Sequence, residues 1–479
     1  MGLALIAALF FALPNALERG VKNPFEDGIW VEEPWGVPVI DRGPKGAWDC
    51  LAVDNPFVLP DGDRLLCFYE GENEAHNEQT GLAVSEDGLR WRKWPHNPIV
   101  KVGPKGAWDS IRAKIPVAVK WRGRYFVLYS GWDGRRKQIG LAVSRDLVRW
   151  EKWPENPVIP CVPGTWEANV STCPAIVKRG DLFCLIYRGM KRLYVEQKLG
   201  LAVSRDLVHW ERHPRNPLLP DIASFALVEV PGGFVGMAQE PEPRHYYFSR
   251  DLVRWERAGF VYFSAEGVDT PSQPFRWGDD WIVLYEKGGD RIYRARFERR
   301  SHQLPFFDDF RSPLRGGLPK WAPLVGGWEL RGGRYWQTGG GDLWQRAIAW
   351  AEPADDFALS VEVRGESKSG WVGVVFRHRR GFYSFALAMD GRNVARLFKS
   401  PTGERFDVAW RKDARFDARP GRAYKIEVVM RGRKITCKVD GRIVLEVEDP
   451  EPLPPGRAGL FATAARASFD NFWLQKLSG

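Results

Sequence analysis

Apolar and polar residues alternate in short runs along most of the chain, which is the pattern of half-buried β-strands. Four such runs follow one another at residues 114–120, 124–129, 139–144 and 148–153. A Gly-containing turn, Trp121-Arg-Gly-Arg124, separates the first two runs. Four consecutive antiparallel strands of this length predict one blade of a β-propeller.

The same unit recurs along the first part of the chain. Gly-Leu-Ala-Val-Ser begins at residues 81, 140 and 200, and each copy leads through an acidic turn to a Trp. A shorter fourth copy runs from 248 to 255, and a fifth unit has strand-like runs only at 273–276, 281–286 and 291–297. Residues 28–34 are expected to supply its fourth strand and so remove an open sheet edge. The sequence therefore predicts an all-β chain with a five-bladed β-propeller over residues 28–304.

The repeat stops near residue 304, and residues 305–479 alternate without that period. Strands are predicted at 357–363, 370–377, 383–389, 424–430 and 434–439, with Asp440-Gly441 as a hairpin turn. The segments 307–310 and 469–472 are expected to lie side by side. This part resembles a concanavalin A-like (laminin G-like) jelly-roll β-sandwich. It is interpreted either as a carbohydrate-binding module that uses Trp344, Trp371 or Trp410, or as a rigid spacer.

Composition adds limits on partners and location. The net charge of +10 comes from scattered Lys and Arg without a nucleic-acid motif, so no nucleic acid is expected, although an anionic substrate fits. The apolar run 3–13 is shorter than the ~20 residues of a membrane span, so no membrane insertion is expected. It predicts a signal segment within residues 1–20 and a secreted or periplasmic protein; without that signal the protein is expected in the cytoplasm. The six Cys lack metal-ligand spacing, so no metal site or cofactor is expected beyond a structural calcium ion.

Two sets of positions mark the predicted active face, where strand one begins and strand two ends. The residue two before the strand-one Pro differs between blades, as an asymmetric ligand requires: Asp54, Lys114, Thr172 and Glu229. The residue after the preceding Trp is more constant: Asp49, Asp109 and Glu167. This constant set is read either as a structural cap or as a set of channel carboxylates. The loops after strand two carry Glu70, His76, Asp133 and Arg188.

The motifs Trp-Asp-x6-Pro, Tyr-x-Gly and Gly-Leu-Ala-x-Ser-x-Asp-x-x-x-Trp resemble the five-bladed propellers of glycoside hydrolase families 43, 32, 117 and 130. In families 43 and 32 an Asp, an Asp and a Glu act from just before the strand-one Pro of the first three blades. This chain has Asp54, Lys114 and Thr172 at those places, so only the first position matches.

The resemblance implies a glycosidase that cleaves an oligo- or polysaccharide with one carboxylic acid and one carboxylate. Asp54 or Asp49 is the predicted general base, Glu167 or Glu229 the general acid, and Asp109 an orienting carboxylate. The predicted substrate contacts are Glu70, His76, Lys114, Asp133, Arg188 and Glu240.

Two alternatives stay open. A phosphorylase resembling family 130 would need one acid and a cationic phosphate pocket, which Arg112, Lys114, Arg188 and Lys191 could form. A non-catalytic glycan-binding propeller would explain the missing blade-two Asp and blade-three Glu.

Overall fold

The computed structural model describes residues 23–239, 244–339, 343–403 and 407–477. The predicted signal segment and Glu240 lie outside these residues, so export stays a prediction. Within the described ranges every regular element is a β-strand, and no helix long and apolar enough to cross a membrane occurs there. The described residues divide into two compact units: those within 23–26, 32–258 and 267–297 form the first, and those within 27–31, 259–266 and 298–477 form the second.

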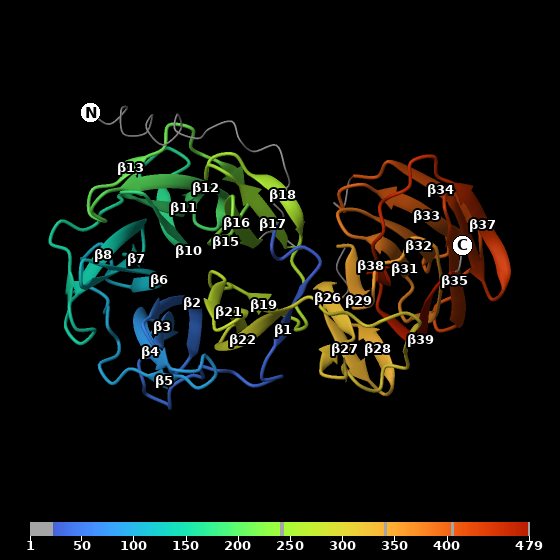
Figure 1. The fold of residues 1–479 in the computed structure, drawn as a ribbon, viewed down its shortest axis with the longest axis horizontal. Helices are drawn as coiled ribbons and strands as arrows, with labels where there is room; N and C mark the ends of the chain where they lie inside the picture. The colour runs from blue at the N-terminus through green and yellow to red at the C-terminus, as the bar shows by residue number, and fades with distance from the viewer. Residues whose placement is uncertain (1–22, 240–243, 340–342, 404–406, 478–479) are drawn as a thin grey trace. The chain divides into compact units, whose positions relative to one another are not determined.

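The first unit is a five-bladed propeller, whose blades surround a centre in Figure 1. The first strands of blades one to four contact one another in turn around that centre, β2 with β6, β6 with β10, and β10 with β15, and β2 also contacts β21 of blade five. Blade one holds β2 (Ala52–Asp61), β3 (Arg64–Glu72), β4 (Glu78–Ser85) and β5 (Arg92–Lys93). Blade two holds β6 (Arg112–Trp121), β7 (Arg124–Trp132), β8 (Lys137–Ser144) and β9 (Trp150–Lys152). Blade three holds β10 (Asn169–Arg179), β11 (Leu182–Arg192), β12 (Val195–Ser204), β13 (Glu211–Arg212) and β14 (Leu219–Pro220).

The last two blades differ from the first three in their first strands. Blade four holds β15 (Ser224–Val230), β16 (Gly233–Gln239), β17 (His245–Ser249) and β18 (Glu256–Phe260). Blade five splits its first strand into β19 (Val268–Asp269) and β20 (Phe275–Trp277), both paired with β21 (Asp280–Lys287), and adds β22 (Arg291–Glu298). The predicted closing strand is confirmed, because β1 (Ile29–Glu32) pairs with β22.

Apolar side chains hold the blades together. The alternating strands of blades one to three place Phe68, Val117, Leu128 and Leu185 in one buried cluster that extends from blade to blade. Burial of each such side chain, relative to leaving it exposed to water, stabilises the fold by roughly 1.5–3 kcal/mol. The alternation that predicted the strands therefore also builds the contacts between blades.

The second unit contains two large sheets, which enclose a core of residues such as Phe376, Phe385, Leu460 and Phe469. The strands of the first sheet are β27 (Trp328–Arg331), β28 (Arg334–Gln337), β39 (Ala467–Lys476), β30 (Phe357–Gly365), β35 (Ala423–Arg431), β36 (Lys434–Val439) and β37 (Arg442–Glu448), with β23 (Phe306–Asp308) on β39. The second sheet runs β26 (Trp321–Val325), β29 (Gln345–Ala349), β38 (Arg457–Thr463), β31 (Trp371–His378), β32 (Phe382–Ala388), β33 (Val394–Ser400) and β34 (Trp410–Arg415). A small hairpin joins β24 (Leu314–Arg315) to β25 (Leu318–Pro319).

The sandwich predictions hold at residue level. Phe307 pairs with Trp473, so the two terminal segments lie side by side as expected. Asp440 and Gly441 both have positive φ, 50° and 78°, as a two-residue hairpin turn requires. Trp410 packs against Tyr383 on the core side of its sheet, with ring centroids 5.9 Å apart, and is partly buried.

Candidate active site

The carboxylates that follow the repeated Trp belong to the scaffold, which corrects their prediction as channel groups. Asp49 accepts hydrogen bonds from the Tyr69 hydroxyl at 3.1 Å and from Lys93 Nζ at 2.6 Å. Blade two repeats the arrangement around Asp109, with Tyr129 at 2.9 Å and Lys152 at 2.5 Å, and blade three repeats it around Glu167, with Tyr187 and Arg212. A carboxylate fixed by a tyrosine and a cation of its own blade in three blades is a structural cap.

The Tyr-x-Gly motif belongs to the same scaffold. A Cβ on Gly71 or Gly81 would collide with the Trp48 ring, and Gly131 and Gly140 stand in the same relation to Trp108. The glycines therefore let the indole lie flat against strands two and three. The variable residue between the Tyr and the Gly of the motif, such as Glu70 in blade one, faces the centre of the propeller.

Glu229 also lies away from the centre. Pro56, Pro116 and Pro174 fall in bulges of their first strands, where the ladder register shifts and a missing N–H is tolerated. β15 has no such bulge, and Glu229 pairs with Phe234 beside the hairpin turn at the opposite end of the strand. The blade-four residue at the central end is Ser224, which pairs with Gln239. The prediction for Glu229 was wrong because it counted two residues back from Pro231, and that proline follows β15 instead of lying within it.

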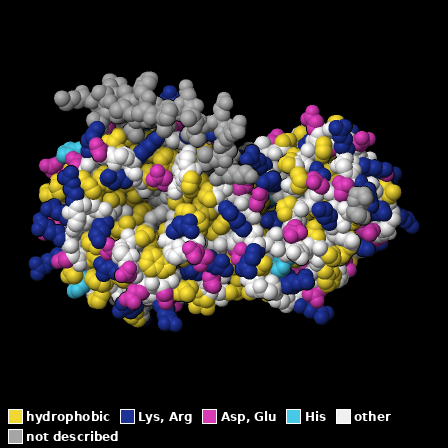
Figure 2. Space-filling model, viewed as in Figure 1, with side chains coloured by type: hydrophobic (Ala, Val, Ile, Leu, Met, Phe, Trp, Pro, Cys, Tyr) yellow, Lys and Arg dark blue, Asp and Glu magenta, His cyan; other side chains and the backbone are white. Residues whose placement is uncertain are grey.

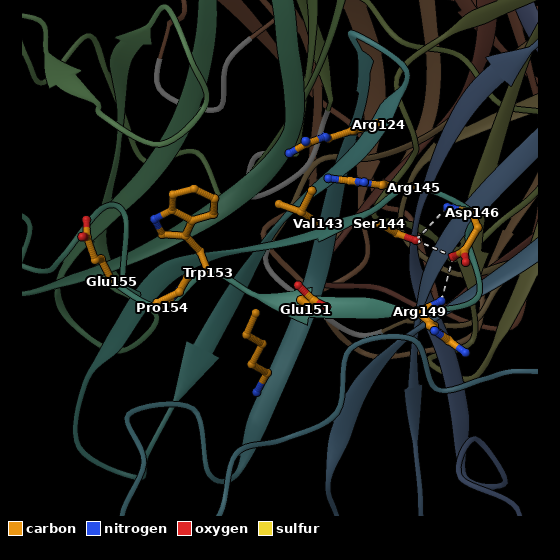
Figure 3. A pocket seen from close by; sticks show the side chains of 11 residues that line it. Arg124, Val143, Ser144, Arg145, Asp146, Arg149, Glu151, Trp153, Pro154 and Glu155 are labelled. Carbon is orange, nitrogen blue, oxygen red and sulfur yellow. Dashed lines mark hydrogen bonds between the residues drawn. The ribbon is translucent and has the colours of Figure 1, made fainter.

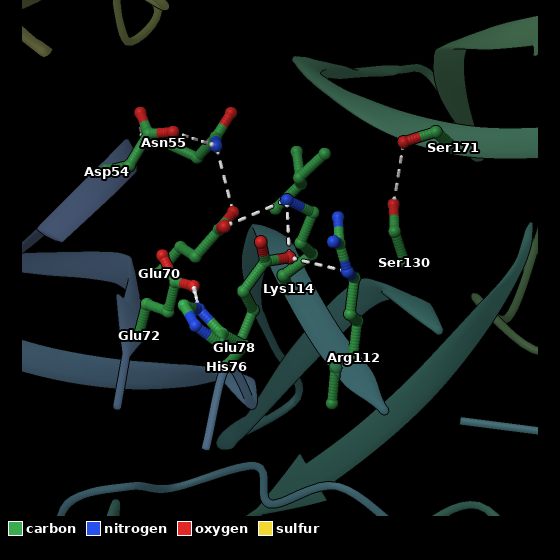
Figure 4. Close-up of polar contacts among 12 residues, drawn as sticks. Asp54, Asn55, Glu70, Glu72, His76, Glu78, Arg112, Lys114, Ser130 and Ser171 are labelled. Atoms are coloured by element: carbon green, nitrogen blue, oxygen red, sulfur yellow. Dashed lines mark hydrogen bonds and ion pairs between the residues drawn. The ribbon is translucent and has the colours of Figure 1, made fainter. Parts of the chain in front are cut away.

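Asp54 stands at the central end of β2 and faces Glu70 across the ladder. The amide of Asn55 joins the two carboxylates, donating to Asp54 Oδ2 at 2.8 Å and to Glu70 Oε2 at 2.9 Å (Figure 4). Lys114 from blade two donates to Glu70 Oε1 at 2.9 Å and pairs with Glu78 Oε2 at 2.6 Å. These side chains, with Glu286 of blade five, are called the central cluster below.

Blade five completes the acidic side of the central cluster. Asp269 and Glu286 face each other at the positions that Asp54 and Glu70 hold in blade one. Glu286 is buried and accepts a hydrogen bond from the Gly289 amide, and Asp269 accepts one from the Gln239 side chain. Blades one and five therefore each bring a pair of carboxyl groups to the centre.

Blades two and three supply the basic side. Arg188 is buried within β11 and donates to Gln197 and to Ser171 Oγ, at 3.1 and 3.4 Å. Lys137 is 1% exposed, and its Nζ lies 3.5 Å from the Tyr194 hydroxyl. No carboxylate lies within ion-pair distance of Lys137 among the residues that the structure describes.

The predicted position Thr172 has a different part. The hydroxyls of Thr172 and Ser171 each form a hydrogen bond with Ser130 Oγ, at 2.8 and 2.9 Å. The three hydroxyls therefore make a buried cluster between blades two and three. These hydroxyls lie on the basic side, where Ser171 accepts from Arg188, and they add no charge.

Burial and like charge raise the pKa of Asp54 well above its usual range, with Glu70 and then Glu286 as the charged neighbours and Lys114 opposing them. Burial, Asp269 and Asp290 raise the pKa of Glu286 to about 7. Burial, helped by Lys114 and Arg188, lowers the pKa of Lys137 well below its usual value. Burial and like charge therefore favour the protonated form of Asp54, and burial favours the uncharged form of Lys137.

The remaining predicted contacts lie further out. His76 is exposed and pairs with Glu72 at 2.6 Å, and Asp133 caps its own turn by accepting from the amides of Arg135 and Arg136. Lys191 is exposed on the hairpin that carries Tyr194. None of these side chains contacts the central cluster.

Sequence reasoning missed four residues of the centre, Glu78, Lys137, Asp269 and Glu286. One signal was present: Glu286 follows Tyr285 as Glu70 follows Tyr69, so the tyrosine marks the central position of strand two. No comparable signal marks Lys137, because the loop between strands two and three varies in length.

Other surface features do not compete with this site. A hollow of about 570 Å³ lies at the end of blade two where β8 finishes, beside the Ser144–Asp146 turn, and Arg124, Arg145 and Arg149 line it (Figure 3). This is the end of the blade away from Lys114. Basic and acidic side chains are intermixed on the face shown in Figure 2. The described residues contain no group of three or more His, Cys, Asp and Glu placed to hold a metal ion.

Comparison with known proteins adds chemistry to this geometry. The family model of β-1,4-mannooligosaccharide phosphorylases matches residues 48–228, and that of 3-keto-α-glucoside-1,2-lyase-like domains matches residues 320–475. The uncharacterized protein Rv1502 of Mycobacterium tuberculosis (strain H37Rv) is 29% identical over 212 residues, 40% of this chain and 67% of its own length. The β-1,2-mannobiose phosphorylase of Thermoanaerobacter sp. (strain X514) is 27% identical over 130 residues, 24% of this chain and 42% of its own length.

Among solved structures, the family 117 glycoside hydrolase Zg3597 of Zobellia galactanivorans overlaps with a TM-score of 0.48 at 15% identity, covering 58% of this chain and 91% of that one. The matched phosphorylase region spans blades one to three, which supply Asp54, Glu70, Lys114, Lys137 and Arg188. Fold, site and sequence match define a carbohydrate-active enzyme, a glycoside hydrolase or phosphorylase.

Proposed function

We propose that the propeller cleaves a β-mannosidic bond by phosphorolysis, with Asp54 as the general acid. Similarity to the mannooligosaccharide and mannobiose phosphorylases supports the sugar and the reaction. The observation that carries the proposal is the division of the centre. On one side burial and neighbouring carboxylates raise the pKa of Asp54, and on the other side the buried Lys137 and Arg188 lie without a carboxylate at ion-pair distance among the described residues.

In this mechanism the central cluster moves one proton and fixes one anion. A phosphate oxygen attacks the anomeric carbon while the C1–O bond to the next sugar breaks. Asp54 donates its proton to the departing oxygen, and the proton of the phosphate restores Asp54. The products are mannose 1-phosphate and a sugar shorter by one residue. Lys137, protonated when the anion binds, and Arg188 would hold the phosphate.

Hydrolysis is the second candidate, and Glu286 favours it. A carboxylate with a pKa of about 7 is suited to act as a general base for water at neutral pH. Asp54 as acid and Glu286 as base would then form an inverting pair. Both mechanisms use Asp54 as the acid, which reverses its predicted role as base.

The test incubates β-1,2- and β-1,4-mannobiose with the enzyme, with and without inorganic phosphate, and identifies the products. Phosphorolysis predicts mannose 1-phosphate only when phosphate is present, and Lys137→Met should raise the KM for phosphate by about 10-fold or more. Free mannose as the sole product, formed at a rate independent of phosphate, would establish hydrolysis instead. The matched control is Lys152→Met, which removes a scaffold lysine of the same blade.

A further inference from the structure

The outer face of the second sheet in the sandwich unit is only partly covered. Phe260 and Tyr262 of the segment 259–266 pack on one part of it, against Phe382 and Trp350. Beyond them a hollow of about 250 Å³ remains, with Trp344 and Trp371 among its lining residues. Its lining residues include members of β38, β31, β32, β33 and β34, so it follows the face of the sheet.

The floor of the hollow is aromatic and fixed. The Trp344 ring packs on Phe398 with centroids 5.0 Å apart and meets Phe382 and Phe461 edge-on at 5.5 and 6.4 Å. Trp344 is nevertheless only half-buried, and it forms part of the wall. A rigid aromatic surface of this kind suits the apolar C–H face of a sugar ring, with little conformational entropy lost on binding.

The rim is basic. Arg396 lies over the Trp371 ring at 4.6 Å and binds Asp413 through Nε and Nη2, both at 2.7 Å, which leaves its Nη1 free of that carboxylate. Arg411 is exposed, and no carboxylate lies within ion-pair distance of it in the described ranges. Phe398 pairs with Arg411 across the ladder, so the cation stands beside the aromatic floor. The lining residues include no Asp or Glu.

We propose that this hollow binds a single uronic acid unit of an acidic glycan. The sugar ring would lie on the Trp344 surface, and its carboxylate would face Arg396 and Arg411. A volume of about 250 Å³ is below the ~300–1,000 Å³ of pockets for drug-sized ligands, so one ring fits better than an extended chain. The site would hold the enzyme on a charged polysaccharide and is independent of which bond the propeller cleaves.

Calorimetric titration of the full chain tests the proposal, with Asp54→Asn introduced to stop turnover. D-galacturonate and D-galactose are the probes, because they differ only in the carboxylate. We expect galacturonate to bind with a Kd on the order of millimolar and galactose at least about 10-fold more weakly. Arg411→Gln should weaken galacturonate binding by about 10-fold or more.

Two control variants locate the binding. Arg433→Gln, at an exposed hairpin turn of the other sheet, should leave binding unchanged. Lys137→Met should also leave it unchanged, which separates this hollow from the centre of the propeller. Equal binding of the two sugars, no binding of galacturonate, or loss in Lys137→Met with none in Arg411→Gln would each overturn the proposal. A failure of phosphorolysis would leave all these expectations unaltered.

Discussion

The propeller uses carboxylates in two ways, and the difference lies in what surrounds them. Asp109 meets a tyrosine and a lysine of its own blade, and equivalent contacts recur in blades one and three. Asp54 meets side chains that differ from blade to blade, and the carboxylates Glu70 and Glu286 outweigh Lys114 among its charged neighbours. A repeated set of partners neutralises charge and fixes a turn, whereas an unrepeated set leaves a titratable group under strain from like charge. In a ring of similar blades, catalytic residues are therefore expected at equivalent positions where the residue type differs between blades.

The largest expected effect comes from Asp54→Asn. Removal of the general acid should lower kcat by about 100- to 10,000-fold, with the melting temperature equal to or above that of the wild type, because a desolvated carboxyl is replaced by an amide. Turnover and thermal unfolding measure the two parts. Near-normal turnover of the variant would refute the acid role.

Asp109→Asn should have the opposite effect to Asp54→Asn: it should lower stability and leave turnover nearly unchanged. Loss of this carboxylate leaves the buried Tyr129 hydroxyl and Lys152 without their partner, so unfolding should become easier by about 1–3 kcal/mol. Turnover at a temperature where the variant is folded should stay within about twofold of the wild type. Denaturant unfolding measures the expected loss of stability, and steady-state kinetics measures the expected retention of turnover. A loss of kcat without a loss of stability would instead support the prediction that Asp109 is a catalytic carboxylate in the channel.

Glu286→Gln separates the two mechanisms through pH. Cleavage needs protonated Asp54, so the rate falls as pH rises through the raised pKa of Asp54. Removing the negative charge of Glu286 lowers that pKa, and the alkaline limb of the kcat profile should move to lower pH while the enzyme stays active. If Glu286 is the base for water, the variant loses activity at every pH instead.

The smallest effect is expected for Tyr194→Ala. Tyr194 is 55% exposed, and its ring stands 5.1 Å from Lys137 Nζ, so it offers an aromatic surface at the mouth of the site. Loss of sugar stacking there should raise the KM for the oligosaccharide about 3- to 10-fold at constant kcat. Tyr194→Phe, which keeps the ring, serves as the control and should behave like the wild type.

Much of this architecture could be predicted from the sequence, because strands and blades each produce a periodic pattern of residues along the chain. Alternation fixed the strands, the 81, 140 and 200 repeats fixed the blades, and the closing strand at 29–32 followed from the need to pair an edge. Asp54 and Lys114 were also predicted, since their position differs between blades while the flanking motifs do not, and Glu70 and Arg188 were predicted from their place where strand two ends.

The rest depended on contacts that sequence spacing does not encode. Whether Asp49, Asp109 and Glu167 face the centre or their own blade depends on the tyrosine of strand two and the cation of strand four, which are distant in the chain. Glu229 was misplaced because β15 lacks the bulge that aligns the other prolines. Lys137 gained its role only through burial, which its position at the start of β8 does not predict.

The protonation of Asp54 is the central claim, and infrared difference spectroscopy of the carboxyl groups tests it directly. The spectrum of Asp54→Asn subtracted from that of the wild type at neutral pH should contain the C=O stretch of one protonated carboxylic acid. The same subtraction with Asp109→Asn should contain only an ionised carboxylate. A carboxylate signal alone in the Asp54 difference would contradict the account, because an ionised Asp54 has no proton to give to the departing sugar.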